Sequence, residues 1–188
     1  MTVAKGVTVP SASIVIGMSP EAAAVARTVC GGGPAGAPVR AESTVEGAMF
    51  SFGDGHARQG EGETCGVAVE CAMDSVVIVD LIKGVPTPWP RLESDAEIMT
   101  TGSSRPLEDA FRISHQQMTR WVAELTGMSE LDSYQLVSQA ALSPVANVVD
   151  TVYTMVCKLP KSLLGGVAPM QGVHAKLRRQ AAHWGGAA

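Results

Sequence analysis

The sequence lacks several features that would assign a function class directly. It has no uninterrupted apolar run near the ~20 residues that a membrane-spanning helix needs. It has no basic excess, since its formal net charge is −4, so we do not expect the dense basic face that binds nucleic-acid phosphates. Only Lys5 precedes the short apolar stretch 11–18, which makes a poor signal peptide. We expect a cytoplasmic protein with neither a membrane nor a nucleic acid as partner.

The four cysteines, at positions 30, 65, 71 and 157, show no Cys-x-x-Cys spacing. This absence excludes zinc-ribbon and thioredoxin-type motifs. Cys65 and Cys71 are an even number of residues apart, so in one strand they would share a face. We expect both to be reduced core residues, and a nucleophilic role for Cys65 is less favoured because nothing nearby would activate its thiol.

What the sequence does contain is the composition of one globular domain. It has 188 residues, of which 46% are apolar and 17% are charged. That length suits one domain better than two. No internal repeat is found. Changes of composition along the chain predict a divergent N-terminal segment with a Gly/Pro-rich loop (1–45), a central domain (46–165) and a partly ordered basic tail (166–188).

Strands are predicted from alternation and from β-branched residues. Residues 65–73 place Cys, Val, Val, Cys and Met on one face, which is typical of a half-buried strand. Residues 75–83 are rich in valine and isoleucine and indicate a buried strand. We expect further strands at 12–16, at 47–52 and within 148–159.

Two amphipathic helices are predicted near the C-terminal third. The first spans 106–126 and ends before Gly127, a residue suited to the position just past a helix. The second begins after Ser129, where Ser-Glu-Leu-Asp resembles a capping box, and runs to about Leu142. A third helix, capped by Ser19, is expected at 19–30.

Isolated polar residues give weaker signals. His115 is expected to be a solvated or boundary residue of the first helix, and His174 and His183 are expected to be exposed in the tail. A Ser-His-Asp triad is not expected, because the serines considered have no obvious base partner in the sequence. These are Ser103, Ser104 and Ser138.

The Gly-rich stretch 53–70 concentrates groups that bind metals or move protons. Asp54 and His56 are two residues apart, as are Glu61 and Glu63, so each pair points one way in extended backbone. A divalent ion, zinc by preference, could be bound between an imidazole and carboxylates. Such an ion would polarise an amide carbonyl or acidify a bound water, and Glu63 could act as a general base.

Two other interpretations of this stretch remain open on the residues alone. Gly-Asp-Gly is also an ordinary hairpin turn, in which acidic side chains are merely solvated. Calcium is possible for an oxygen-rich loop, but His56 is a poor calcium ligand and the EF-hand spacing is absent.

The same stretch carries a family resemblance. Residues 52–70, with Glu-Gly-Ala-Met-Phe at 46–50 before them, resemble the signature of the acetamidase/formamidase family. The resemblance continues, in the family's order, through the segments at 104–111, 134–138, 148–150 and 159–164. It covers 46–164, about two-thirds of the chain.

The resemblance implies a metal-dependent hydrolase that cleaves the carbon–nitrogen bond of small linear amides, such as formamide or acetamide, and releases ammonia. It implies an α+β, predominantly β fold, with a jelly-roll-like β-sandwich and a few helices. Carried over by position, it makes Asp54 and His56 the metal ligands. The catalytic set is then Glu63, Asp54 and His56, and Gln59 and Gly60 would contact the substrate.

The sequence departs from the family pattern upstream of this stretch. Family members place a Gly-Gly-Asn-Met-Asp type motif there, whereas this chain has Gly-Gly-Gly-Pro-Ala-Gly at 31–36. The alternative is therefore a truncated, non-catalytic metal- or ligand-binding remnant of the same fold. Half of a sheet pair would also leave apolar faces exposed, which predicts a homo-oligomer.

Overall fold

The computed structural model describes residues 12–18, 39–43, 56–72, 77–83, 85 and 87–184. Every structural statement that follows concerns these residues. Four expectations fall outside them: the helix at 19–30, the loop at 31–38, the strand at 47–52 and the placement of Asp54.

Seven strands form one sheet, and each neighbouring pair is antiparallel. Their order across the sheet is β5-β1-β2-β6-β7-β9-β8. The bounds are β1 (Ala12–Met18), β2 (Val39–Ser43), β5 (Val77–Lys83), β6 (Arg91–Glu93), β7 (Glu97–Ser104), β8 (Val145–Asn147) and β9 (Tyr153–Pro160). The strands predicted at 12–16, at 75–83 and within 148–159 are thereby confirmed.

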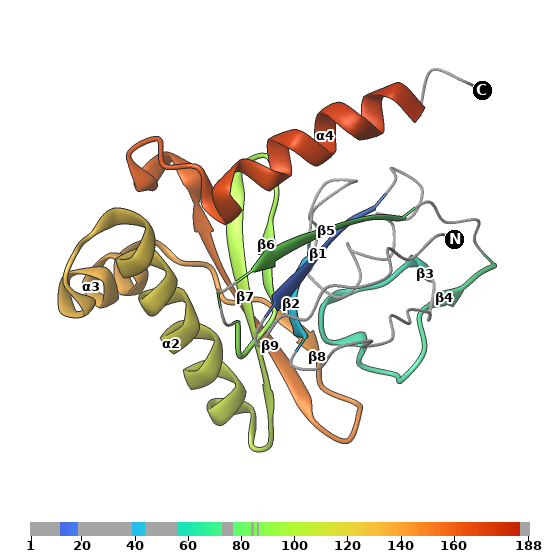
Figure 1. Ribbon diagram of the computed structural model, residues 1–188. Coiled ribbons are helices and arrows are strands. Elements are labelled where there is room, and N and C mark those ends of the chain that lie inside the picture. Colours follow the sequence, from blue (N-terminus) through green and yellow to red (C-terminus); the bar gives the residue numbers. More distant parts are fainter. Residues whose placement is uncertain are drawn as a thin grey trace.

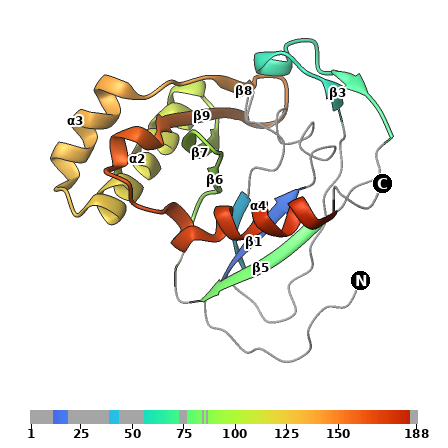
Figure 2. The same cartoon turned by 90° about the horizontal axis from the view of Figure 1, so that it is seen from above.

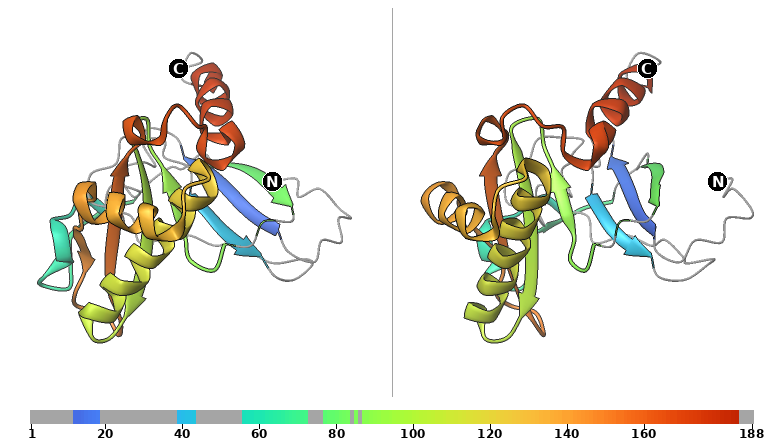
Figure 3. Two further views of the ribbon diagram at one scale, coloured as in Figure 1. Left: turned by 90° about the vertical axis from the view of Figure 1, so that its left-hand side faces the viewer. Right: turned by 60° about the vertical axis from the view of Figure 1, so that its left-hand side comes forward.

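Both predicted helices near the C-terminal third are present as α2 (Leu107–Thr126) and α3 (Glu130–Ala140). They lie side by side, and α2 packs along β7 and β9 (Figures 1 and 3). Gly127 ends α2 at φ 73°, and its N–H donates to the carbonyl of Ala123 at 2.9 Å. Ser129 caps α3, because its hydroxyl oxygen accepts the N–H of Asp132 at 3.1 Å.

The core follows from the alternation of β7 and β9. Ile98, Cys157 and Leu159 point toward α2, where they join the fully buried Trp121 and other apolar side chains of the helices. Met99 and Val156, the residues between them, form a second buried cluster. Because residues 155–159 are all buried, β9 is covered on both faces.

Helix α2 approaches the sheet most closely at Gly102 of β7. A Cβ at this position would collide with the carbonyl oxygen of Ala110 and would lie 2.7 Å from the amide nitrogen of Ser114. Two residues earlier on the same strand, Thr100 helps to fix the same helix, since its hydroxyl donates to the carbonyl of Ser114 at 2.7 Å. A side chain at 102 would therefore force the helix away from the sheet.

The tail, expected to be partly ordered at best, contains helix α4 (Val173–Trp184), which lies across the sheet near β1 (Figure 2). His174 is buried, so the expectation that it is exposed is wrong. Its Nε2 lies 2.7 Å from Asp95 Oδ1, and Arg178 donates to the other oxygen of that carboxylate at 3.1 Å. The hydrogen bond from His174 is the main reason that the pKa of Asp95 is lowered.

A partly buried ion pair lies near Asp95, where Lys161 donates to the buried Glu93 at 2.6 Å. Burial raises the pKa of the Glu93 carboxyl, while the Lys161 ammonium acts in the opposite direction. The Lys161 ammonium therefore favours the charged form of the buried Glu93 carboxyl.

The prediction that Cys65 and Cys71 are core residues is wrong, because both are exposed. The strand predicted over 65–73 is only the two-residue β4 (Val69–Glu70), whose side chains are both exposed. Because only two residues of the alternating segment pair as a strand and both are exposed, the alternation of apolar residues does not produce burial here.

Thiol labelling should separate the cysteines sharply. Cys157 is buried, and burial raises its pKa to about 12, so roughly one thiol in 10⁴ is ionised at pH 8. Iodoacetamide at pH 8 is expected to modify Cys65 and Cys71 rapidly and to leave Cys157 intact until the protein is denatured. Peptide mass spectrometry reads each site. Modification of Cys157 at the rate of the other two would contradict the described core.

The observed class is mixed, with sheet and helix in one domain. Helical residues, α and 3-10 together, outnumber strand residues in the part of the chain that is described, so the β-dominated expectation is not supported there. The jelly-roll-like sheet pair, the domain boundaries and the homo-oligomer stay predictions. No helix among the described residues has the length and apolar character needed to cross a membrane.

Candidate metal centre

Residues 56–70 of the Gly-rich stretch fold into a small ribbon on the side of the main sheet away from α2 and α3 (Figures 1 and 2). It consists of β3 (His56–Arg58) and β4 (Val69–Glu70), which pair antiparallel, with the 3-10 turn η1 (Glu61–Glu63) between them. Gly62 has φ 83° and is buried, and glycine alone adopts this backbone without strain. The turn can therefore press against β8.

Strand pairing places His56 directly opposite Glu70. The imidazole Nε2 lies 2.9 Å from Glu70 Oε1, and the His56 side chain is buried while that of Glu70 is 55% exposed. On the other side of the ring, Nδ1–H donates to Gln59 Oε1 at 2.7 Å. A proton fixed on Nδ1 leaves the Nε2 lone pair facing a carboxylate, and this arrangement is favourable when a second proton or a cation lies between them.

Glu63 is held by the main sheet rather than by the ribbon. Asn147 of β8 donates through Nδ2 to Glu63 Oε2 at 3.0 Å. The orientation of that amide is fixed, because Asn147 Oδ1 accepts the backbone N–H groups of Val149 and Asp150 at 3.0 and 3.1 Å. The backbone N–H of Val148 also donates a hydrogen bond of 2.9 Å to the carbonyl of Gly62, which strengthens the same contact.

Glu63 also has a strained backbone. Its φ of 46° lies in the left-handed region, which costs a non-glycine residue on the order of 1–3 kcal/mol. Strain of this kind persists where the surroundings hold the residue in place, as Asn147 does here. The strain is consistent with a functional role for the carboxylate.

His56, Glu63 and Glu70 together form a candidate metal centre. One ligand atom from each residue lies within 4.8 Å of those of the other two. One imidazole nitrogen and two carboxylate oxygens are a donor set that zinc accepts, and the two negative charges suit a divalent cation. The residues present therefore fit a metal of the kind that the sequence predicts.

Only some of the predicted site residues lie together in the structure. It brings His56 and Glu63 together and leaves Glu61 exposed outside the cluster. Gln59 supports His56, and Gly60 lies exposed at the start of η1, so substrate contact by either residue stays a prediction. Asp54 lies outside the described residues, and its role as a ligand also stays a prediction.

Two residues of the centre were missed in the sequence. Glu70 was assigned only to one face of a strand, although a hairpin with its turn between 59 and 68 would have placed it opposite His56. Asn147 is 84 residues from Glu63, and no local pattern could have linked them.

The helix-backed antiparallel sheet and the acid–histidine cluster together define an α+β domain with a candidate hydrolytic centre. The sequence matches the Acetamidase/Formamidase family over residues 34–155, which include the whole cluster. The chain therefore belongs to the Acetamidase/Formamidase family.

Solved structures support the same assignment. An acetamidase from Yersinia enterocolitica is 41% identical, with a TM-score of 0.67, over 68% of this chain and 39% of its own. An acetamidase from Bacillus halodurans is 28% identical over 71% of this chain and 45% of its own, also with a TM-score of 0.67. A predicted acetamidase/formamidase from Thermoanaerobacter tengcongensis is 27% identical over 85% of this chain and 56% of its own, with the same TM-score.

The chain spans between 39% and 56% of the length of these three proteins. No curated protein matches it.

Proposed function

We propose that the protein hydrolyses the carbon–nitrogen bond of small linear amides, such as formamide or acetamide, and releases ammonia. The observation that carries this proposal is the cluster of His56, Glu63 and Glu70 inside the segment that matches the family. A buried imidazole, a hydrogen-bonded acid and a strained backbone meet at one point there. Plain solvation of a surface turn would require none of these features.

A divalent cation, zinc by preference, would be held by His56 and Glu70, with Asp54 as a further predicted ligand. When bound, it would polarise the amide carbonyl and acidify the attacking water. Gln59 keeps the proton of the imidazole on Nδ1, so that Nε2 remains available as a ligand atom. Calcium is less favoured, since an imidazole nitrogen belongs to this donor set.

Glu63 would act as the general base. Asn147 occupies Oε2 of the carboxylate, which leaves Oε1 to accept a proton. Glu63 would take a proton from water as the water oxygen bonds to the amide carbon. It would return that proton to the amide nitrogen as the carbon–nitrogen bond breaks, so the products are ammonia and a carboxylic acid.

The proposal is tested by measuring ammonia from formamide and acetamide, with protein that has been stripped by a chelator and then reloaded with Zn²⁺. We expect release only with metal, and Glu63→Gln should lower kcat by about 10²–10⁴-fold, the usual contribution of a general base. Glu61→Gln is the matched control, since Glu61 is an exposed acid of the same turn.

Failure of the folded, metal-loaded protein to release ammonia from either amide would overturn the proposal and favour the non-catalytic remnant. Equal losses in Glu63→Gln and Glu61→Gln would remove the assigned role of Glu63. Metal analysis of the same samples reports binding separately from turnover.

A further inference from the structure

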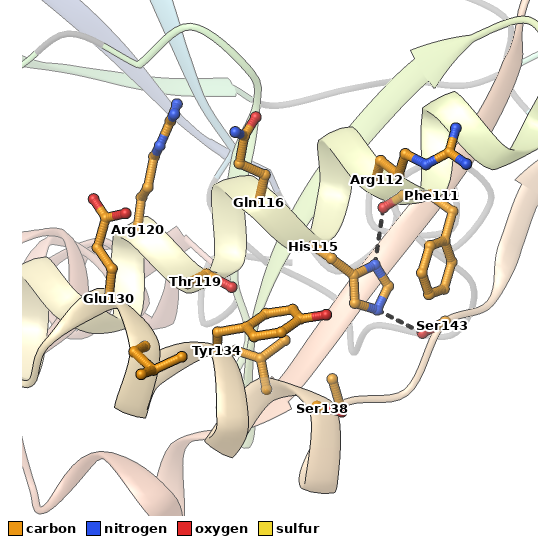
Figure 4. A pocket seen from close by; sticks show the side chains of 13 residues that line it. Phe111, Arg112, His115, Gln116, Thr119, Arg120, Glu130, Tyr134, Ser138 and Ser143 are labelled. Carbon is orange, nitrogen blue, oxygen red and sulfur yellow. Dashed lines mark hydrogen bonds between the residues drawn. The ribbon is translucent and has the colours of Figure 1, made fainter.

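A second cluster of reactive groups lies in the groove between α2 and α3 (Figure 4), and these helices lie on the side of the sheet away from the ribbon (Figures 1 and 2). The groove has a volume of about 640 Å³. His115 of α2 and Ser143, which follows α3, both line it side by side, and Ser143 Oγ lies 3.0 Å from His115 Nε2.

The hydrogen bonds fix the tautomer of His115. Its Nδ1 lies 2.9 Å from the carbonyl oxygen of Phe111, which can only accept, so Nδ1 carries the proton. In the neutral ring Nε2 then has a free lone pair, and the hydroxyl of Ser143 donates to it. Burial lowers the pKa of His115, which favours this neutral form.

The ring is also held in place. Phe111 stacks on it with ring centroids 3.8 Å apart and an interplanar angle of 24°. The arrangement thus contains a hydroxyl, a base within hydrogen-bond reach and a third group that orients the base. These are the three parts of an activated serine nucleophile, here with a backbone carbonyl in the place of a carboxylate.

We propose that Ser143 and His115 form a nucleophile–base dyad that accepts acyl groups from small esters bound in the groove between α2 and α3. The apolar part of the ester would contact Phe111 and the exposed ring of Tyr134, which both line the groove. In Figure 4 the hydroxyl of Tyr134 points to the side on which His115 lies. This hydroxyl is the donor assigned to the developing oxyanion.

The chemistry balances without a co-reactant other than water. Ser143 Oγ bonds to the ester carbon as its proton passes to His115 Nε2, and the carbonyl electron pair moves to oxygen. Collapse breaks the bond to the alcohol, which leaves with the proton from His115. Water then attacks the acyl-serine in the same way, releases the acid and restores the dyad.

The dyad is tested with diisopropyl fluorophosphate, which phosphorylates activated serines with loss of fluoride. We expect one adduct per chain, mapped to Ser143 by peptide mass spectrometry, and no adduct in Ser143→Ala. His115→Gln should slow its formation about 10²-fold or more, because the base is lost. Ser138→Ala is the matched control and should label at the wild-type rate, since Ser138 lines the same groove.

Mapping of the adduct in the folded wild-type protein decides the question even if a variant fails to fold. Absence of label at Ser143, or labelling at an equal rate in His115→Gln, would show that the pair is only a structural hydrogen bond. The adduct should form equally in chelator-treated protein, in which the proposed amide hydrolysis is abolished. Each proposal can therefore fail without the other.

Discussion

Replacement of His56 with alanine is expected to remove metal binding and ammonia release together. The imidazole is buried, and both of its nitrogens face oxygen atoms of the centre, one on Gln59 and one on Glu70. Without it, the only nitrogen donor of the cluster is lost, and two carboxylates face each other with nothing between them. We expect the kcat/KM for ammonia release to fall about 10³-fold or more, and bound metal to fall well below one equivalent.

Two further variants isolate the cause. Glu70→Gln keeps the size of the side chain but removes one negative charge. It should therefore weaken metal binding while His56 stays in place as a ligand. Arg58→Ala changes an exposed residue on the same strand and should leave both activity and metal content near the wild-type level. Retention of metal and of activity by His56→Ala would require a different centre.

Gly102→Ala is expected to have the largest effect on stability. The added methyl group would meet the carbonyl of Ala110 and the backbone of Ser114, neither of which can rotate away, so α2 would have to move. Overpacking of this kind costs about 1–3 kcal/mol. For a chain of this length each kcal/mol lowers Tm by roughly 2–4 °C, which calorimetry resolves.

Gly60→Ala provides the matched control for stability. Gly60 has an ordinary φ of −85°, and no atom lies within 4 Å of the position that its Cβ would take. Its Tm should stay close to that of the wild type. If Gly102→Ala also left the Tm unchanged, α2 would not pack against β7 as closely as described.

The sequence predicted those parts of the fold that local patterns determine. The helix predicted over 106–126, its glycine stop and the cap at Ser129 depend on residues within one or two turns of each other, and all three are confirmed. The β-branched run at 75–83 gave β5 for the same reason. Periodicity is a property of neighbouring residues, so it predicts helices and strands without knowledge of the tertiary fold.

The errors arose where long-range contacts decide. Cys65 and Cys71 alternate as in a buried strand, but both are exposed and only residues 69–70 between them form a strand. His174 was placed in solvent because a tail was expected, whereas Asp95, from 79 residues earlier, holds it in the interior. The candidate centre shows both cases, since the signature supplied His56 and Glu63 while Asn147 required the folded sheet.

The dependence of Glu63 on Asn147 has a consequence for how the protein responds to heat. The ribbon is a two-stranded element with little core of its own, and among the described residues its attachment to the end of β8 includes the hydrogen bonds from Asn147 and from Val148, which follows the strand. Small units of this kind open with a lower free energy than the domain that carries them. Thermal inactivation should then begin below the melting transition of the sheet and be reversed by cooling. A cation, if held by His56 of β3 and Glu70 of β4, would stabilise the folded ribbon and so reduce the difference between the two temperatures.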